Sequence, residues 1–246
     1  ILSRMASIVF LHGLAGSRHQ FDYIADKFPN AVVFDLPGFG DAVNTLPKHS
    51  SELCYSSELY VEWLRGKIQK PSIIVGYSMG AIIAKDFALR YPELVTKLLL
   101  IAYPLQRDTL SLRRTFFGAS WLNRLYIDKS WLAKFMCKTI CEPGIVPRFF
   151  IYPFARIFTP KYFLVVSDYF RHTYRSVSSA MHDTLLKDDP QTLRKVKAKI
   201  VLIMGDKDRY VDHSLVNDFR HHIIKNMDHL MFDHEKEIVE ALKKEL

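Results

Sequence analysis

The sequence predicts an α/β fold: a mostly parallel sheet flanked by helices, with a helical segment inserted between two late strands. Three observations support this prediction. Six short apolar runs alternate with stretches of helical periodicity, the runs are apolar on both faces, and the middle third of the chain interrupts this rhythm. The runs are Ala6–Phe10, Ala31–Phe34, Ile73–Val75, Leu98–Ile101, Ile200–Met204 and His222–Ile224. With 246 residues, the chain is long enough for one domain with a substantial core.

Helical patterns fill the intervals between these runs. Ser17 and Gln20 have the spacing of a capping box and predict a helix that continues through Lys27. A second helix ends before Pro71, and its apolar stripe consists of Val61, Leu64 and Ile68. The stripe of the last helix consists of Ile238, Leu242 and Leu246.

The third strand leads into the sequence Gly-Tyr-Ser-Met-Gly, at residues 76–80, and then into a helix, Met79–Tyr91. In a G-x-S-x-G turn of this kind the serine has a strained backbone, and its hydroxyl is exposed at the carboxyl edge of the sheet. Gly76 and Gly80 relieve the crowding around such a turn. We therefore predict that Ser78 is a nucleophile. The alternative is a serine that only caps the helix.

A serine hydroxyl becomes a strong nucleophile only when a base and an orienting carboxylate assist it. The loop after the fifth strand contains Asp206 and Asp208, and the loop after the sixth contains His229. Asp208 is the preferred acid because Asp206 is better placed to stabilise its own turn, but Asp206 stays an alternative. The rival histidines begin a strand or lie in the first turn of the last helix, and they are His221, His222 and His234. No histidine pair has metal-ligand spacing, so we predict no metal site.

Two backbone N–H groups are candidates to stabilise a negatively charged oxygen. One belongs to Met79, directly after the serine. The other belongs to Leu14, in the loop after the first strand, where Gly13 lets the backbone approach the site. We expect His12 to brace this loop without a catalytic role.

The segment 104–185, called the cap segment below, differs in composition from the flanks, 1–103 and 186–246. It has 12 Lys and Arg against 5 Asp and Glu, and 16 of the 32 aromatic residues. It predicts short helices without a buried strand. The prolines that separate these helices are Pro143, Pro147, Pro153 and Pro160. We expect the two flanks to form a core and the cap segment to form a lid.

Aromatic residues alternate with Arg and Lys at 113–135 and 147–163. This mixture suits an apolar acyl pocket, a surface that contacts anionic lipid, or recognition of an anionic substrate such as a coenzyme A thioester or a carboxylate. Alternatively, the aromatic residues form the cap segment's own small core and the charges face water. No nucleic-acid-binding motif is present, so we do not expect a nucleic-acid partner.

These motifs resemble those of α/β-hydrolase-fold serine hydrolases of the esterase and lipase type, with a helical cap. The resemblance covers residues 9–21, 32–42, 73–101, 200–211 and 228–242. It implies the triad Ser78, Asp208 and His229, the oxyanion donors Leu14 and Met79, no cofactor, and a cap between two late strands.

The chain departs from the family pattern in several places. Ala81 stands where the family usually has Gly, Ala42 stands near a usual Ser, and Asp228 stands where Gly precedes the histidine. The chain also reaches His12 too early to hold two strands that often come first, so the sheet is expected to be reduced at that edge. A serine nucleophile argues against the haloalkane dehalogenase and epoxide hydrolase branches, which use aspartate there.

The function that these patterns predict is hydrolysis of a carboxylic ester with an apolar acyl group, through an acyl-enzyme. One alternative is a thioesterase or a carbon–carbon or elimination enzyme of the same fold, acting on an anionic substrate. The cap arginines available to bind carboxylates are Arg113, Arg114, Arg124 and Arg148. Another alternative is a non-catalytic small-molecule binder.

The remaining features concern location. The three cysteines, Cys54, Cys137 and Cys141, are odd in number and lack zinc-ligand company in the sequence, which favours a reducing, cytoplasmic setting without disulfides. We expect no signal peptide and no membrane-spanning run, although peripheral contact of the cap segment with a membrane is compatible with its composition. The abrupt start at Ile1 suggests that the chain begins downstream of a natural start or was trimmed.

Overall fold

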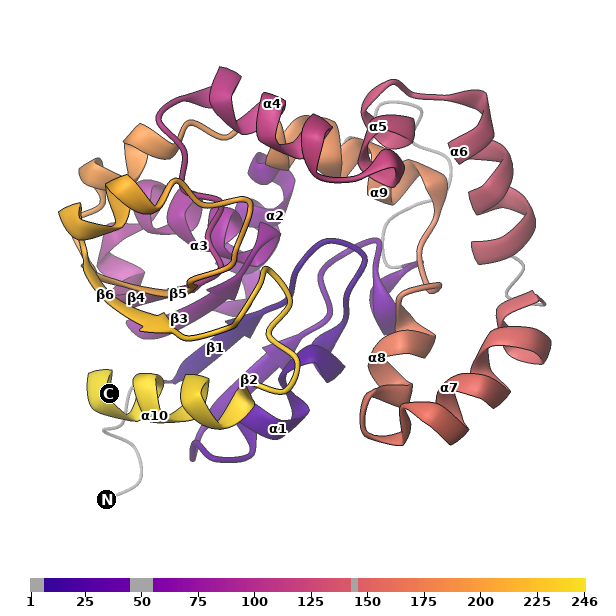
Figure 1. The fold of residues 1–246 in the computed structure, drawn as a ribbon. Helices are drawn as coiled ribbons and strands as arrows, with labels where there is room; N and C mark the ends of the chain where they lie inside the picture. The colour runs from indigo at the N-terminus through magenta and orange to yellow at the C-terminus, as the bar shows by residue number, and fades with distance from the viewer. Residues whose placement is uncertain (1–6, 45–54, 143–145) are drawn as a thin grey trace.

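The computed structural model describes residues 7–44, 55–142 and 146–246, and a six-stranded sheet lies at its centre (Figure 1). The strands are β1 (Ile8–Leu11), β2 (Ala31–Phe34), β3 (Ser72–Tyr77), β4 (Val95–Ile101), β5 (Lys199–Gly205) and β6 (Arg220–Ile224). Their order is β2-β1-β3-β4-β5-β6, and every neighbouring pair is parallel. The six predicted strands are confirmed, with shifts of a few residues at their ends. Among the described residues no strand precedes β1, and β2 forms the edge beside it.

Four helices cover the two faces of this sheet. They are α1 (Asp22–Ala25), α2 (Ser57–Lys67), α3 (Met79–Arg90) and α10 (Glu235–Glu245). Helices α2 and α3 contact each other on one face, and α1 and α10 contact each other on the opposite face. Strand β4 shows why its residues are nearly all apolar. Leu98 and Leu100 join the core beneath α2 and α3, whereas Leu99 and Ile101 join the other core, so side chains on both faces are buried.

Between β4 and β5 the described part of the cap segment consists of helices and turns. The α-helices are α4 (Thr109–Ala119), α5 (Trp121–Ile127), α6 (Trp131–Met136), α7 (Tyr152–Phe158), α8 (Phe163–Asp168) and α9 (Tyr174–Ala180). Three π-helical turns accompany them: η5 (Cys137–Cys141), η6 (Pro147–Ile151) and η8 (Met181–Leu185). Pro147 opens η6 and Pro153 lies in the first turn of α7, as expected of helix-starting prolines, whereas Pro143 and Cys54 lie outside the described residues. The boundaries 104 and 185 stay a prediction.

Shorter 3₁₀ turns complete the chain. They are η2 (Arg18–Phe21), η3 (Gly40–Ala42), η4 (Pro92–Leu94), η7 (Pro160–Tyr162), η9 (Pro190–Lys195) and η10 (His213–Asp218).

Two details of the helix predictions are wrong. Ser17 and Gln20 do not form a capping box, because the Ser17 hydroxyl accepts the N–H of His19 while the Gln20 side chain accepts the N–H of Gly13, and the chain forms η2 and the short α1 instead of a helix through Lys27. On α10, Ile238 and Leu242 are buried but Leu246 is 45% exposed. Glu245 is buried beside it, because its carboxylate pairs with Arg220 and His222 of β6.

Candidate active site

The turn between β3 and α3 holds Ser78 in a backbone conformation that side chains rarely adopt. Its φ is 52° and its ψ is −114°. Two neighbouring positions leave no room for a side chain. A Cβ at Gly76 would lie 2.5 Å from the Cα of Ala81, and one at Gly80 would overlap the carbonyl oxygen of Leu11. The sharp turn therefore requires glycine on both sides of the serine.

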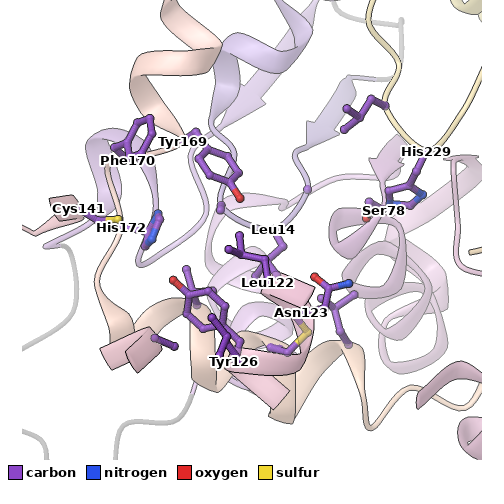
Figure 2. Close-up of a pocket in the computed structure, with 18 of the residues that line it drawn as sticks. Leu14, Ser78, Leu122, Asn123, Tyr126, Cys141, Tyr169, Phe170, His172 and His229 are labelled. Atoms are coloured by element: carbon purple, nitrogen blue, oxygen red, sulfur yellow. Dashed lines mark hydrogen bonds between the residues drawn. The ribbon is translucent and has the colours of Figure 1, made fainter. Parts of the chain in front are cut away.

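The structure brings Ser78, His229 and Asp208 together from the ends of three strands. Figure 2 shows Ser78 beside His229. The Oγ of Ser78 lies 2.8 Å from Nε2 of His229, and Nδ1 of His229 lies 2.9 Å from Oδ2 and 3.1 Å from Oδ1 of Asp208. Since a carboxylate only accepts hydrogen bonds, the proton lies on Nδ1, and Nε2 is left to accept the serine proton. This is the arrangement that an activated serine requires.

Neighbouring groups fix the orientation of the acid and the imidazole. Asp208 is buried, and its Oδ1 accepts the backbone N–H of Tyr210 at 2.9 Å. The hydroxyl of Tyr77 donates to the carbonyl oxygen of His229 at 3.0 Å. The Tyr210 ring packs against the imidazole with a centroid distance of 4.4 Å. The imidazole is therefore held on several sides.

The rival residues make other contacts. Asp206 accepts the N–H of Asn226 at 2.6 Å, so its carboxylate contacts the loop that follows β6, which differs from the predicted role of stabilising its own turn. His221 contacts the carbonyl oxygen of Phe219, and His222 contacts Glu245. His234 is the N-cap residue of α10, directly before its first turn.

The loop after β1 lies against the serine. Leu14 lines the same cavity as Ser78, and Met79 begins α3, where the N-terminal end of the helix dipole favours negative charge. Within the parts of the chain that the structure describes, no protein acceptor takes the N–H of either residue. Both N–H groups are therefore candidates for an oxyanion hole.

His12 braces this loop. Its Nε2 accepts the N–H of Leu36 at 2.9 Å, so its Nδ1 carries a proton and donates to the carbonyl oxygen of Gly13 at 2.8 Å. Burial lowers the pKa of His12 below its usual value, which keeps the imidazole neutral. Sequence reasoning missed Gln20, whose side chain accepts the N–H of Gly13 at 3.0 Å and also lines the cavity.

A cavity of about 620 Å³ begins at Ser78 and His229 and extends beneath the cap segment. In Figure 2, Cys141 and His172 lie at the end opposite to Ser78. The lining is mostly apolar, and among the described residues it contains no Lys, Arg, Asp or Glu. Side chains that line it from the cap segment include Leu122, Met136, Ile140, Val165, Phe170 and Met181. The cavity therefore suits a long apolar group.

The four cap arginines considered for binding carboxylates do not line this cavity. Arg113 donates to the carbonyl oxygen of Leu186 at 2.9 Å, and Arg124 donates to that of Phe117 at 3.0 Å. Arg114 and Arg148 are exposed. The arrangement gives an anionic substrate no cationic partner inside the cavity.

At the far end of the cavity, the two described cysteines have a histidine neighbour that the sequence did not suggest. Donor atoms of Cys137, Cys141 and His172 all lie within 4.8 Å of one another. Hydrogen bonds from Cys141, and then from His172 and Tyr126, lower the pKa of Cys137 to about 5 although burial opposes this. Thiolates and imidazoles are common zinc ligands. However, no fourth thiol, imidazole or carboxylate of the described chain joins this group.

A buried ionic network connects α3 to the segment that follows η8. Lys85 is 2% exposed, and its Nζ lies 2.5 Å from Oδ1 of Asp188 and 2.8 Å from the hydroxyl of Thr192. The other oxygen of Asp188 accepts the Tyr103 hydroxyl at 2.8 Å. Burial lowers the pKa of Lys85, but Asp188 and Asp86 more than offset this, so its pKa lies above the usual value. Thr109, at the start of α4, donates to the carbonyl oxygen of Asp188 at 2.8 Å.

Two curated relatives and one solved structure illustrate what the chain is similar to. BODYGUARD 4 of Arabidopsis thaliana, named a probable lysophospholipase, is 25% identical over 236 residues, which cover 83% of this chain and 53% of that protein. Pimeloyl-[acyl-carrier protein] methyl ester esterase of Neisseria meningitidis is 31% identical over 98 residues, or 39% of this chain and 36% of that protein. The chain thus spans about half, or less, of the length of these relatives.

A solved structure from work on carboxylesterases of Nitrososphaera gargenis has a TM-score of 0.67 and 17% identity, and the match covers 98% of this chain and 89% of that one. This likeness shows the fold. The family model described as "Alpha/beta hydrolase family" matches residues 8–241. Its match covers the sheet, the serine turn and both loops that carry Asp208 and His229. The chain therefore belongs to the alpha/beta hydrolase family.

Proposed function

We propose that the protein is a serine hydrolase that cleaves carboxylic esters with apolar acyl groups through an acyl-enzyme. One observation carries the proposal. Ser78, His229 and Asp208 form a continuous hydrogen-bonded chain at the end of an apolar cavity. The described lining of this cavity contains no Lys, Arg, Asp or Glu. The names of the relatives, a lysophospholipase and a methyl ester esterase, support ester cleavage.

In the first half of the proposed reaction, Oγ of Ser78 attacks the ester carbonyl while Nε2 of His229 takes the serine proton. The carbonyl oxygen becomes negative and accepts the N–H groups of Leu14 and Met79. Asp208 stabilises the imidazolium and keeps its orientation. The tetrahedral intermediate then expels the alcohol, which receives the proton from His229, and Ser78 carries the acyl group.

In the second half, His229 takes a proton from water as the oxygen of that water attacks the acyl carbon. The second tetrahedral intermediate breaks its bond to Oγ of Ser78, which receives the proton from His229, and the carboxylic acid is released. Each half therefore uses the same base and the same two N–H donors, and the reaction consumes one water per ester.

The uncharged cavity favours this reaction over the elimination chemistry considered above. A dicarboxylate would leave its charges unpaired in an apolar space, and desolvation of an unpaired charge is costly. Among the described residues, the polar side chains of the lining carry hydroxyl, amide, thiol and imidazole groups, such as those of Asn123 and Tyr126. A neutral ester with an apolar chain meets no such penalty.

The test combines covalent labelling with turnover. A fluorophosphonate probe is expected to label Ser78 in the wild-type protein, and mass spectrometry of the labelled peptide identifies the site. Ser78→Ala should lose both the label and the hydrolysis of p-nitrophenyl esters, whereas the surface control Ser214→Ala should keep both. Unchanged turnover in Ser78→Ala would refute the assignment.

A second measurement tests the acyl pocket. In a series of p-nitrophenyl esters from acetate to dodecanoate, kcat/KM should rise with acyl length until the cavity is filled, because each buried methylene contributes about 0.8 kcal/mol. A steady fall from acetate onward would show that the apolar cavity does not hold the acyl chain.

A further inference from the structure

The outer side of the cap segment exposes aromatic side chains that a protein surface in water normally buries. Six of them come from α6, η6 and α7, and each is between 56% and 76% exposed. These six residues, the docking face below, are Trp131, Phe135, Phe149, Phe150, Phe154 and Phe158. Figure 1 shows α6 and α7 on the side of the molecule away from the sheet. Exposed apolar side chains that gather in patches, and do not stand singly, mark an interaction site.

The spacing of these residues makes continuous ridges. Trp131 and Phe135 are one helical turn apart, with ring centroids separated by 6.5 Å. Phe150, Phe154 and Phe158 follow at successive intervals of four residues, and the rings of the last two are stacked at 6.2 Å. The aromatic rings therefore gather into ridges instead of being scattered singly.

Two of these elements, α6 and η6, are also apolar on their inner side. Ala133 and Met136 of α6 and Ile151 of η6 line the cavity that begins at Ser78. A cap that faced water on the outside would need an apolar stripe on the inner side only. A helix that is apolar on both sides is typical of a core or of contact with lipid.

Charge identifies the occupant of the docking face. Residues 129–161 contain six Lys and Arg but one acidic residue, Glu142. The cations are Lys129, Lys134, Lys138, Arg148, Arg156 and Lys161. In the described structure, Lys161 pairs with Asp233 and Glu235, whereas Lys134, Lys138, Arg148 and Arg156 have no acidic partner. Aromatic ridges edged by unpaired cations fit a surface of anionic lipid headgroups.

A second copy of the chain fits less well. Two docking faces placed together would bring like charges into contact, which disfavours association. The helices of this face are also short. None of the helices in the described ranges reaches the length and apolar character needed to cross a bilayer. Shallow, peripheral insertion of the aromatic rings is the contact that remains.

We propose that the docking face binds peripherally to anionic membranes, and that the substrates are acyl esters carried in those membranes. The binding part stands on the surface alone, and the substrate part rests on the proposed function. Helix α6 and turn η6 contribute to both the cavity wall and the docking face, so a membrane bound at this face lies across α6 and η6 from the acyl cavity.

Binding is tested by co-sedimentation with vesicles of phosphatidylcholine alone and of phosphatidylcholine mixed with phosphatidylserine. The wild-type protein should sediment with the mixed vesicles and remain in the supernatant when only neutral vesicles are present. Phe150→Ser/Phe154→Ser/Phe158→Ser and Arg148→Glu/Arg156→Glu should each weaken binding by about tenfold or more. The matched control, Lys243→Glu/Lys244→Glu, reverses two exposed charges on α10 and should bind like the wild type.

Activity separates the two parts of the proposal. The triple variant Phe150→Ser/Phe154→Ser/Phe158→Ser should hydrolyse water-soluble p-nitrophenyl butyrate at the wild-type rate. Its turnover of a vesicle-borne acyl ester should fall in proportion to its lost vesicle binding. Ser78→Ala should bind vesicles normally, so its binding is informative even if no hydrolysis is found for the wild type. Equal binding to neutral and mixed vesicles, or a dimer in sedimentation equilibrium that the triple variant abolishes, would overturn the proposal.

Discussion

The sheet core and the cap segment treat their aromatic side chains in opposite ways. Phe10, Phe21 and Phe87 in the core are completely buried, whereas the six aromatic residues of the docking face are more than half exposed. Their backbones differ as well. The core has a strained turn at Ser78 whose neighbours tolerate no side chain, and the cap segment is built from short helices with three π-helical turns. In the core, the turn at Ser78 leaves no room for other side chains beside it. In the cap segment, α6 and η6 present apolar side chains on two sides.

The two regions should therefore respond differently to substitution. Changes near the ends of β3, β5 and β6 should alter the rate of bond cleavage, because the rate falls steeply when hydrogen-bonded reacting groups are displaced. Changes in the cap segment should alter the relative kcat/KM values of different substrates, because the free energy of apolar contact scales with the buried area.

The greatest loss of activity is expected from substitution of Asp208, and Asp206 in the same turn provides the comparison. Asp208→Asn should lower kcat for p-nitrophenyl esters by about 10⁴-fold, since an amide in this position favours the wrong tautomer of His229. Asp206→Asn, two residues away, is the matched control and should change kcat by less than about tenfold, because Asp206 accepts the N–H of Asn226 whereas His229 pairs with Asp208. A larger loss for Asp206→Asn would exchange the roles of the two acids.

The next effect concerns the junction of the two regions. Lys85→Met should lower the free energy of unfolding by about 3–5 kcal/mol, because Asp188 would remain buried without its cation. Urea denaturation measures it. Lys85→Met/Asp188→Leu should recover a large part of the loss, since both charges are then removed together. A double variant less stable than Lys85→Met would contradict this account.

A smaller effect depends on pH and belongs to the core. The pKa of His12 is lower in the folded protein than its usual value of 6.5, so below pH 6.5 the unfolded chain binds a proton that the folded chain does not. Stability should therefore be retained above pH 6.5 and fall as pH decreases below it, by up to about 1.4 kcal/mol per pH unit from this group. Chemical denaturation between pH 5 and 7.5 should show a shallower slope for His12→Gln. Identical slopes would mean that His12 takes up its proton in the folded state too.

The smallest effect belongs to the cap segment. Cys141→Phe should fill the far end of the cavity and lower kcat/KM for dodecanoate by about tenfold while leaving butyrate unchanged, because only the long chain reaches that end. Cys141→Ser keeps the volume and should keep the chain-length profile. If Cys141→Phe reduced butyrate and dodecanoate equally, the cavity would not bind the chain along its length.

The sequence predicted well what depends on local pattern. The six strands follow from short apolar runs, and the turn at Ser78 follows from glycines at fixed distances. The loops of Asp208 and His229 could be assigned because parallel strands end at one edge of a sheet. The preference for Asp208 over Asp206 came from turn chemistry, although the structure shows that Asp206 accepts the N–H of Asn226 in the loop after β6.

Contacts between distant side chains escaped prediction. Lys85 and Asp188 are 103 positions apart, and His172 approaches Cys137 across 35 positions, so no local spacing announces either contact. Gln20 was misread because the capping-box pattern is local, whereas its actual partner, the N–H of Gly13, lies seven residues earlier in a folded loop. The exposed aromatic ridges were visible as composition, but only the structure distinguishes outward residues from those that line the cavity.

The hydrogen bond from Thr109 to Asp188 has an evolutionary consequence. Together with the contact of Arg113 with Leu186, it holds the start of α4 beside the segment that follows η8, so the two ends of the cap segment lie close together. Exchanging or lengthening such a segment changes loop-closure entropy only slowly, by about 0.6 kcal/mol per doubling of length. A lineage could therefore change the lining of the cavity by changing the cap segment, while Ser78, Asp208 and His229, which lie outside that segment, stay where they are.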